Sequence, residues 1–342
     1  MSAPPPPSLD LRRLRVVASL GRGAKGIVFL VDTGSSDAGY RRIWFERDVL
    51  SALDHPLLPK LRGSISTDRI VGFAMDFCSG GDLSSLRRRQ TEKTFSNDVI
   101  RFYAAELVLA LDHLHKQGII YRDLKPENVM IQANGHLMLV DFDLSTRLSS
   151  KPPSKKENRK KNPPKQRRNS NNISPSDPDL EGSGKSNSFV GTEDYVAPEI
   201  IKADGHDFSV DWWSLGVVLY EMVYGRTPFR GLNRKETFYR ILSMDPDLAG
   251  EPSPLRGLIR ALLEKDPRRR VSRGGIMGHE FFRGVDWELI PEMDRPPFIP
   301  GVDRELEKLG DVAGRGGIDV EGVVQSVFGG ADVDGKDGFS GF

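Results

Sequence analysis

The sequence holds a single cysteine, and no long run of apolar residues occurs among its 342 positions. One thiol, Cys78, excludes an internal disulfide and suits a reducing compartment. No apolar stretch approaches the roughly 18 residues that span a bilayer. The first ten residues, MSAPPPPSLD, lack the basic start and apolar core of a secretory signal peptide. These absences predict an intracellular protein rather than a disulfide-rich secreted or membrane-spanning one.

An excess of either charge is also lacking overall, because the net charge is only +1. The distribution is uneven, since residues 151–168 contain nine Lys or Arg and one Glu, a local net charge of +8. From its Lys, Pro, Ser and Asn content, we expect a disordered basic insert over about 149–186. Three interpretations of the insert stay open: a nuclear address, a patch for anionic membranes, or a solvated spacer. It contains no aromatic residue, which argues against a specific nucleic-acid partner.

Strand-like segments come first along the chain, and helical patterns follow. Residues 15–20, 26–31 and 69–77 are rich in Val, Ile and Phe. From 96 to 118 the apolar residues recur at three- and four-residue steps, with Ser96 as the expected N-cap and Gly118 as the expected stop. The positions on this apolar face are Ile100, Tyr103, Leu107, Leu111 and Leu114. Further helices are predicted over 210–225 and 254–265, so the chain is expected to be α+β.

The stretch YRDLKPENV at 121–129 carries the strongest chemical signal. Phosphoryl transfer to a hydroxyl needs a carboxylate to orient the nucleophile, a cation near the transferring group and an amide oxygen for a metal ion. Asp123, Lys125 and Asn128 supply these three groups within one loop. After the apolar HLMLV comes DFD, in which Asp141 is placed to bind Mg²⁺. We therefore predict Asp123, Lys125 and Asn128 as catalytic residues, and Asn128 and Asp141 as metal ligands.

With these motifs the chain resembles the eukaryotic protein kinases from about Leu14 to Trp287. The resemblance also rests on GTEDYVAPE at 191–199, DWWSLG at 211–216, LLEKDPRRRV at 262–271 and RPPFIP at 295–300. It implies that Asp211 braces the catalytic loop and that Arg270 pairs with Glu199. DFD in place of DFG, together with the long insert, is similar to the plant-specific branch of the AGC-type kinases, in particular to the oxidative-signal-inducible and UNICORN kinases. Asp143, the last residue of DFD, stands where a positive φ is expected, which Asp tolerates better than most residues.

This resemblance implies a two-lobed kinase-like fold that binds ATP and Mg²⁺ between its lobes. A small β-rich N-lobe is expected over 11–78 and a larger helical C-lobe over 79–287. A disordered Pro-rich segment, 1–10, precedes them, and an AGC-type tail, 288–342, ends in FSGF. The implied activity is that of a monomeric serine/threonine protein kinase, which transfers the γ-phosphate of ATP to protein substrates in intracellular signalling.

The glycines Gly21, Gly23 and Gly26 form a GxGxxG pattern followed by Val28. Glycines at such a loop let the backbone approach phosphates closely, so all four residues are predicted to contact ATP.

Other nucleotide contacts come from the resemblance alone. It places Met75 at the gatekeeper position, Asp76 to Cys78 at the adenine-facing hinge, and Asp82 near the ribose. Asp82 and Glu127 also lie at positions that bind basic residues in related kinases. Substrates with Arg or Lys near the acceptor are therefore expected.

What a kinase of this kind should have, and this sequence lacks, belongs between Val28 and Glu46. Glu46 fits the glutamate that pairs with the family's phosphate-clamping lysine, because Phe45, Val49 and Leu53 form one apolar helical face around it. Yet Glu46 follows Val28 by only 18 residues (46 − 28), and no lysine occurs in the interval. The third strand of the N-lobe, which carries that lysine, is predicted to be missing.

Several consequences of this gap stay open. Residues 40–45 (YRRIWF) could form a replacement strand and so shorten the helix that carries Glu46. Lys25, in the glycine loop, could replace the missing clamp. The gap could also reflect an incomplete gene model or a splice variant. The alternative function is that of a pseudokinase, which scaffolds partners through its helical lobe.

Regulation is predicted at two places. SNSFVGT at 186–192 puts Ser188 where AGC kinases carry their activating phosphate, and a phosphate there would pair with Arg122; Ser186 is a competing site. Phe339 and Phe342 have a spacing that resembles the hydrophobic motif for docking on the phosphoinositide-dependent kinase. We expect the protein in the cytoplasm, the nucleus or both, or at the periphery of the plasma membrane through the basic insert.

Overall fold

The computed structural model describes residues 8, 15–16, 22–23, 26–27, 31–32, 37–66, 70–148, 186, 188–294, 296–300 and 318–319. The predictions for Gly21, Lys25, Val28, Phe339, Phe342 and nearly all of the basic insert lie outside these residues. The chain divides into two compact units. The first comprises Met1–Gly80, Ile131–Met138 and Phe298–Phe342, and the second comprises Gly81–Met130 and Leu139–Pro297. In the described part, no helix combines the length and the apolar character needed to cross a bilayer.

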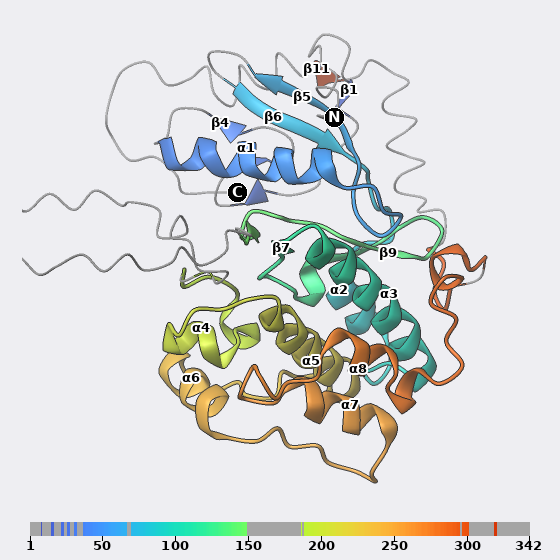
Figure 1. Cartoon of the computed structure of the whole chain (residues 1–342). Helices are drawn as coiled ribbons and strands as arrows, with labels where there is room; N and C mark the ends of the chain where they lie inside the picture. Colours follow the sequence, from blue (N-terminus) through green and yellow to red (C-terminus); the bar gives the residue numbers. More distant parts are fainter. Residues whose placement is uncertain are drawn as a thin grey trace, which may run out of the picture. The chain divides into compact units, whose positions relative to one another are not determined.

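The first unit is built on a small antiparallel sheet (Figure 1). Its strand order is β4–β6–β5, with bounds Val31–Asp32 for β4, Ile70–Met75 for β6 and Leu61–Ser66 for β5. Two short pairs accompany it: β1 (Arg15–Val16) with β11 (Ile318–Asp319), and β2 (Arg22–Gly23) with β3 (Gly26–Ile27). Among the described residues, two pair with β6 on the side away from β5: Val31 with Val71 and Asp32 with Ile70.

The helix α1 spans Asp37–Ala52 and lies alongside β5 and β6 in Figure 1. Residues 40–45 lie within this helix, so the alternative in which they make a replacement strand is wrong. The physical reason is twofold. They continue without a break into the turns that bury Val49 and Leu53, and β4 already supplies the pairing beside β6. Helical hydrogen bonds then satisfy their backbone locally.

Close backbone approach joins distant segments of the first unit at Gly80. Its N–H donates to the carbonyl of Ile131 at 2.9 Å. A Cβ atom at Gly80 would lie 2.7 Å from both Ile131 Cβ and Pro300 Cγ, nearer than side chains can pack. Only glycine therefore lets the RPPFIP segment reach this position.

The second unit is mainly helical, with α5 at its centre. Its helices are α2 (Leu83–Arg89), α3 (Asn97–Lys116), α4 (Pro198–Lys202), α5 (Ser209–Tyr224), α6 (Arg234–Ser243), α7 (Pro254–Leu262) and α8 (Arg273–Met277). Helices α3 and α7 pack against α5, most of whose residues are buried (Figure 1). A short strand pair, β7 (Ile119–Ile120) with β10 (Thr146–Arg147), accompanies these helices. In a second pair, β8 (Val129–Ile131) with β9 (Leu137–Leu139), the residues from 131 to 138 are counted in the first unit.

The helix predicted from apolar periodicity, α3, is confirmed. Its N-cap is Ser96, whose Oγ accepts the N–H of Val99, and Gly118 follows its end with a φ of 75°. All five residues of the predicted apolar face are fully buried. The predicted helices over 210–225 and 254–265 correspond to α5 and α7.

Candidate active site

A buried carboxylate on the first turn of α5 holds the loop that begins at Tyr121. Asp211, which is 0 % exposed, accepts the N–H of Tyr121 at 3.0 Å and that of Arg122 at 2.8 Å. It also contacts His115 Nε2 at 2.7 Å. Arg122 has a φ of 70°, which is unfavourable for a residue with a side chain, and these bonds offset that cost. The prediction that Asp211 braces the loop is confirmed.

The carboxylate of Asp123 is fixed through both of its oxygens. Oδ1 accepts from the backbone N–H of Thr192 at 3.1 Å and from its hydroxyl at 2.7 Å. Oδ2 accepts from Lys125 Nζ at 2.7 Å and from Asn128 Nδ2 at 3.1 Å. The three residues predicted as catalytic are thus brought together around one buried carboxylate.

Thr192 is a site residue that the sequence reasoning did not assign. Besides its two bonds to Asp123, its hydroxyl accepts from Lys125 Nζ at 3.0 Å. Its place in GTEDYVAPE was visible in the sequence, but its partners lie 67 and 69 residues away. Only the fold reveals this contact.

Asp141 follows β9 and turns back on its own chain. Its Oδ1 accepts the N–H of Asp143 at 3.3 Å, as in an Asx turn. The positive φ, 62°, belongs to Asp141 and not to Asp143, where it was expected, because this turn stabilises it at the first residue of DFD. Burial raises the pKa of the Asp141 carboxyl, the N–H of Asp143 lowers it, and the charge of Asp123 raises it further. A cation nearby would favour the charged form.

The side-chain oxygen atoms of Asp141 and Asn128 are suitable ligands for a hard cation. Asn128 Nδ2 donates to the carbonyl and to Oδ2 of Asp123, which leaves the amide oxygen of Asn128 for a metal ion. Within the described ranges, no group of three or more His, Cys, Asp or Glu side chains is arranged to hold a metal. One carboxylate and one amide oxygen fit Mg²⁺, which usually keeps several waters and takes substrate phosphates as further ligands.

Arg122 reaches the two serines of the SNSFVGT stretch. Its Nη1 donates to Ser186 Oγ at 3.0 Å and also to Ser188 Oγ, and its Nε donates to the carbonyl of Leu144 at 2.6 Å. Ser186 is buried, and it exchanges two backbone hydrogen bonds with His206, at 2.9 and 2.8 Å. Ser188 is only half-buried, so it is the more accessible hydroxyl beside the guanidinium.

The predicted hinge residues of the first unit use their side chains structurally. The carboxylate of Asp76 accepts from the N–H of Lys60 at 3.1 Å and from Arg62 Nε at 2.5 Å, both near β5. Cys78 is buried, with Sγ 3.6 Å from Met138 Sδ, and burial raises the pKa of its thiol to about 12, with the charge of Asp76 adding. Met75 ends β6.

The remaining predicted residues belong to different helices and strands. Asp82 is the N-cap of α2, where its carboxylate accepts from the N–H and the hydroxyl of Ser85, both at 2.7 Å. Glu46 is half-buried on α1. Gly23 and Gly26 face each other in the β2–β3 pair. The described structure thus assigns the side chain of Asp82 to capping.

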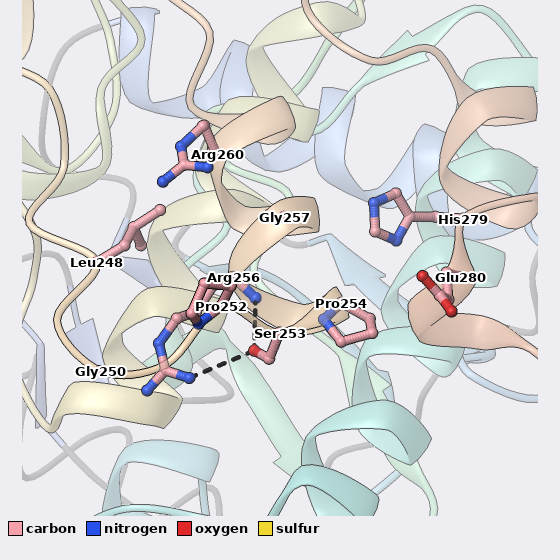
Figure 2. Close-up of a pocket in the computed structure, with 10 residues that line it drawn as sticks. All are labelled: Leu248, Gly250, Pro252, Ser253, Pro254, Arg256, Gly257, Arg260, His279 and Glu280. Carbon is pink, nitrogen blue, oxygen red and sulfur yellow. Dashed lines mark hydrogen bonds between the residues drawn. The ribbon is translucent and has the colours of Figure 1, made fainter.

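A cavity of about 500 Å³ lies at the start of α7 (Figure 2). Arg256, one of the arginines in its lining, donates to the carbonyls of Ala249 and Glu251 at 2.9 and 2.8 Å and lies 3.4 Å from Ser253 Oγ. The guanidinium therefore holds the segment before α7 in place. None of the predicted site residues lines this cavity.

Comparison with known proteins agrees with this geometry. Residues 15–282 match the family described as protein kinase domain. The serine/threonine-protein kinase OXI1 of Arabidopsis thaliana is 52% identical over 366 residues, covering 94% of this chain and 86% of that protein. The serine/threonine-protein kinase UCN of the same plant is 43% identical over 365 residues, covering 92% and 89%. Phototropin-2 of Oryza sativa subsp. japonica is 43% identical over 325 residues, covering 87% of this chain and 35% of that protein.

The first of these alignments is longer than this chain. Its 366 positions exceed the 342 residues of this chain. OXI1 therefore carries residues for which this chain has no counterpart.

Proposed function

This chain belongs to the protein kinase family and is a plant AGC-type serine/threonine-protein kinase, and on that premise we propose the roles of its site residues. Its α+β fold is the two-lobed fold of that family with a reduced sheet in the smaller lobe. Members of the family act on proteins and use ATP with Mg²⁺. The proposals concern which residues of this chain carry out each part of that reaction.

Asp123 is the residue that orients the acceptor hydroxyl. The substrate oxygen attacks the γ-phosphorus, the bond from that phosphorus to the β–γ bridging oxygen breaks, and the hydroxyl proton passes to Asp123. The observation that supports this role is the fixation of both carboxylate oxygens by Thr192, Lys125 and Asn128. Such positioning lowers the entropic cost of reaction, and Lys125 adds positive charge near the transferring phosphoryl group.

Asn128 and Asp141 are the proposed Mg²⁺ ligands, through the amide oxygen and the carboxylate. When bound, the metal ion neutralises charge on the phosphates. Burial raises the pKa of the Asp141 carboxyl, and a cation bound beside it would favour the charged form. Gly21, Gly23, Gly26 and Val28 are the proposed contacts of the phosphates, and the backbone from Met75 to Cys78 that of the adenine.

The missing lysine sets the expected rate. No lysine occurs between Val28 and Glu46, so Glu46 has no lysine of that segment to position. We expect phosphoryl transfer by the printed chain to be slower by about 10²–10³ than in a version that carries such a lysine, by analogy with the loss of one preorganised charge contact. Transfer of radiolabelled phosphate to a generic Ser/Thr substrate tests this, with Asp123→Asn as the control. Transfer that is undetectable, or that survives Asp123→Asn, contradicts the proposal.

A pseudokinase that scaffolds partners is the second candidate, and the same missing lysine favours it. An incomplete gene model would remove that argument. The size of the native transcript product across 28–46 discriminates them. An added strand with a lysine in the cellular protein excludes the scaffold as an explanation of the gap.

Ser188 is the proposed activating phosphosite. Arg122 already donates to its hydroxyl, and a phosphate there would add about −1.5 to −2 charges next to the guanidinium. We expect Ser188→Ala to remove phosphate-dependent activation, whereas Ser186→Ala keeps it because Ser186 is buried and backbone-pinned. Site mapping by mass spectrometry together with rate measurements checks this. Phosphate on Ser186 alone contradicts it.

Partners and location are proposed from the sequence. Phe339 and Phe342 are proposed to dock on the upstream phosphoinositide-dependent kinase, and undiminished pull-down after deletion of 339–342 contradicts this.

Substrates with a basic residue near the acceptor are proposed to contact the exposed Glu127. The protein is proposed to be a monomer of the cytoplasm or nucleus, with peripheral plasma-membrane contact through residues 151–168. Imaging of a fluorescent fusion with and without those residues tests the location.

A further inference from the structure

A cavity of about 530 Å³ adjoins the catalytic loop in the second unit. Lys125 and Thr192, which both contact Asp123, belong to its lining. A polypeptide whose hydroxyl is held at Asp123 therefore passes along this cavity. Its occupant is the segment that flanks the acceptor residue of the substrate.

Two acidic side chains in the lining are already occupied within the protein. Glu221 is buried, its Oε1 accepts from Arg87 Nη2 at 2.8 Å, and its Oε2 accepts from the hydroxyl of Tyr195. The carboxylate of Asp194 accepts from Thr227 Oγ1 at 3.2 Å. Glu221 is thus neutralised by a cation of the protein, whereas a hydroxyl group leaves the negative charge of Asp194 in the lining.

Two arginines in the same lining lie far from their ionic partners in the described part of the chain. Arg226 and Arg230 have side chains that are 61% and 76% exposed. Their recorded ion pairs are long, 3.5 Å from Arg226 to Asp247 and 3.9 Å from Arg230 to Asp194. Exposed pairs at such distances contribute little, so both guanidinium groups can exchange them for a better partner.

The cavity therefore has charges of both signs in its lining. Glu127 is exposed and supplies negative charge next to the catalytic loop. Arg226 and Arg230 supply positive charge from the segment that follows α5. A uniformly basic peptide would leave Arg226 and Arg230 without an anionic partner from the substrate.

We propose that Arg226 and Arg230 select protein substrates that carry an anionic side chain, a carboxylate or a phosphate, in the segment flanking the acceptor. A guanidinium presents paired N–H donors that match the oxygens of either group. This inference rests on the proposed function and adds a second, opposite charge requirement to the one assigned to Glu127. Because both arginines are exposed, the selection weakens as salt increases.

Peptide binding tests the proposal without requiring catalysis. Fluorescently labelled serine peptides are prepared as pairs, with Asp or Asn at one position, and the position is varied along the flanks of the acceptor; a phosphoserine series is a third arm. The purified chain is titrated at low and high salt. The variant is Arg226→Gln with Arg230→Gln, and the control is Arg283→Gln, an arginine outside the cavity with a side chain 80% exposed.

At one or more positions the chain should bind the Asp peptide about threefold to tenfold more tightly than its Asn twin. The double variant should lose this preference, whereas Arg283→Gln should retain it. High salt should reduce the preference of the unmodified chain. The phosphoserine arm decides whether phosphate is preferred to carboxylate. Equal affinity for all twins, absence of binding, or a preference that survives in the double variant overturns the proposal.

Phosphoryl transfer to the neutral peptide separates the two claims. Transfer without charge discrimination leaves the proposed function standing and removes this inference. Charge-selective binding without transfer contradicts the proposed function and leaves the charge selection standing. Thermal melts of the double variant and of Arg283→Gln verify that loss of selectivity is not loss of folding.

Discussion

Arg270 holds both carboxylate oxygens of Glu199, with distances of 2.6 Å from Nη1 to Oε1 and 3.0 Å from Nη2 to Oε2. The two side chains are 0% and 3% exposed. Nη1 also donates to the carbonyl of Ser209, at the start of α5, at 2.8 Å. The pair therefore ties α4, α5 and the segment after α7 together, and the pairing implied by the family resemblance is confirmed.

Removing one partner of this pair should be costly. Arg270→Met leaves the carboxylate of Glu199 buried without its cation, and we expect the free energy of unfolding to fall by about 3–5 kcal/mol. Urea denaturation monitored by circular dichroism measures the change. Arg283→Met, which breaks an exposed pair with Glu280, should change the free energy by less than about 1 kcal/mol. Equal effects of the two substitutions would contradict the assigned role.

Asp211→Asn should disturb the catalytic loop more than it unfolds the protein. An amide offers one acceptor oxygen where the carboxylate offers two, so the N–H of Tyr121 or of Arg122 loses its partner. We expect a loss of about 1–3 kcal/mol in the free energy of unfolding. Phosphoryl transfer should fall further than this loss explains, because Arg122 precedes Asp123. Asp204→Asn, at an exposed position, is the matched control, and an unchanged rate in Asp211→Asn falsifies the bracing role.

Lys265 should make stability rise with pH. Its Nζ lies 3.9 Å from the ring centre of Phe229 and 5.0 Å from that of Trp213, and burial lowers its pKa from 10.5 to about 8. Between those two values the unfolded chain binds more protons than the folded one, so unfolding becomes less favourable as pH increases. Melting temperatures of the wild type and of Lys265→Met are compared from pH 7 to 10. The wild type should gain stability relative to Lys265→Met over this range.

An exposed lysine offers the control for that measurement. Lys235→Met should follow the wild type at every pH, because Lys235 is exposed on α6. Parallel curves for the wild type and Lys265→Met would show that Lys265 is not desolvated.

Cys78 should be unreactive in the folded protein. Burial raises its thiol pKa to about 12, so little thiolate forms near neutral pH, and the thiolate is the reactive species. A thiol reagent at pH 8 should label the native chain slowly and label one thiol at once in urea. Since the chain has only this cysteine, no other thiol confuses the count. Rapid, complete labelling without denaturant would contradict the buried placement.

The parts of the fold that the sequence predicted are those with local causes. Helix α3 follows from the spacing of its apolar residues and from the cap at Ser96, which act within a few residues. Asp123, Lys125 and Asn128 lie within six positions, so their meeting also needs little of the fold. The pairing of Arg270 with Glu199 spans 71 residues and was available only through the family resemblance.

The parts that the sequence missed depend on partners far along the chain or on local capping. The carboxylate of Asp76 contacts Arg62, 14 residues before it across the β5–β6 pair, and nothing local in the sequence indicates this contact. Asp82 likewise serves as the cap of α2. The pairing of Val31–Asp32 with β6 joins segments separated by all of α1, and two residues carry no periodicity that could reveal a strand.

That short pairing constrains any longer version of this protein. Val31 and Asp32 already hydrogen-bond to the edge of β6 at Val71 and Ile70. An added strand that carried the lysine could pair with this edge only by displacing Val31 and Asp32, because one strand edge pairs with one neighbour at a time. Such an insertion would therefore change which segments pair in the sheet instead of lengthening a surface loop. The two forms would differ in topology and not merely in size.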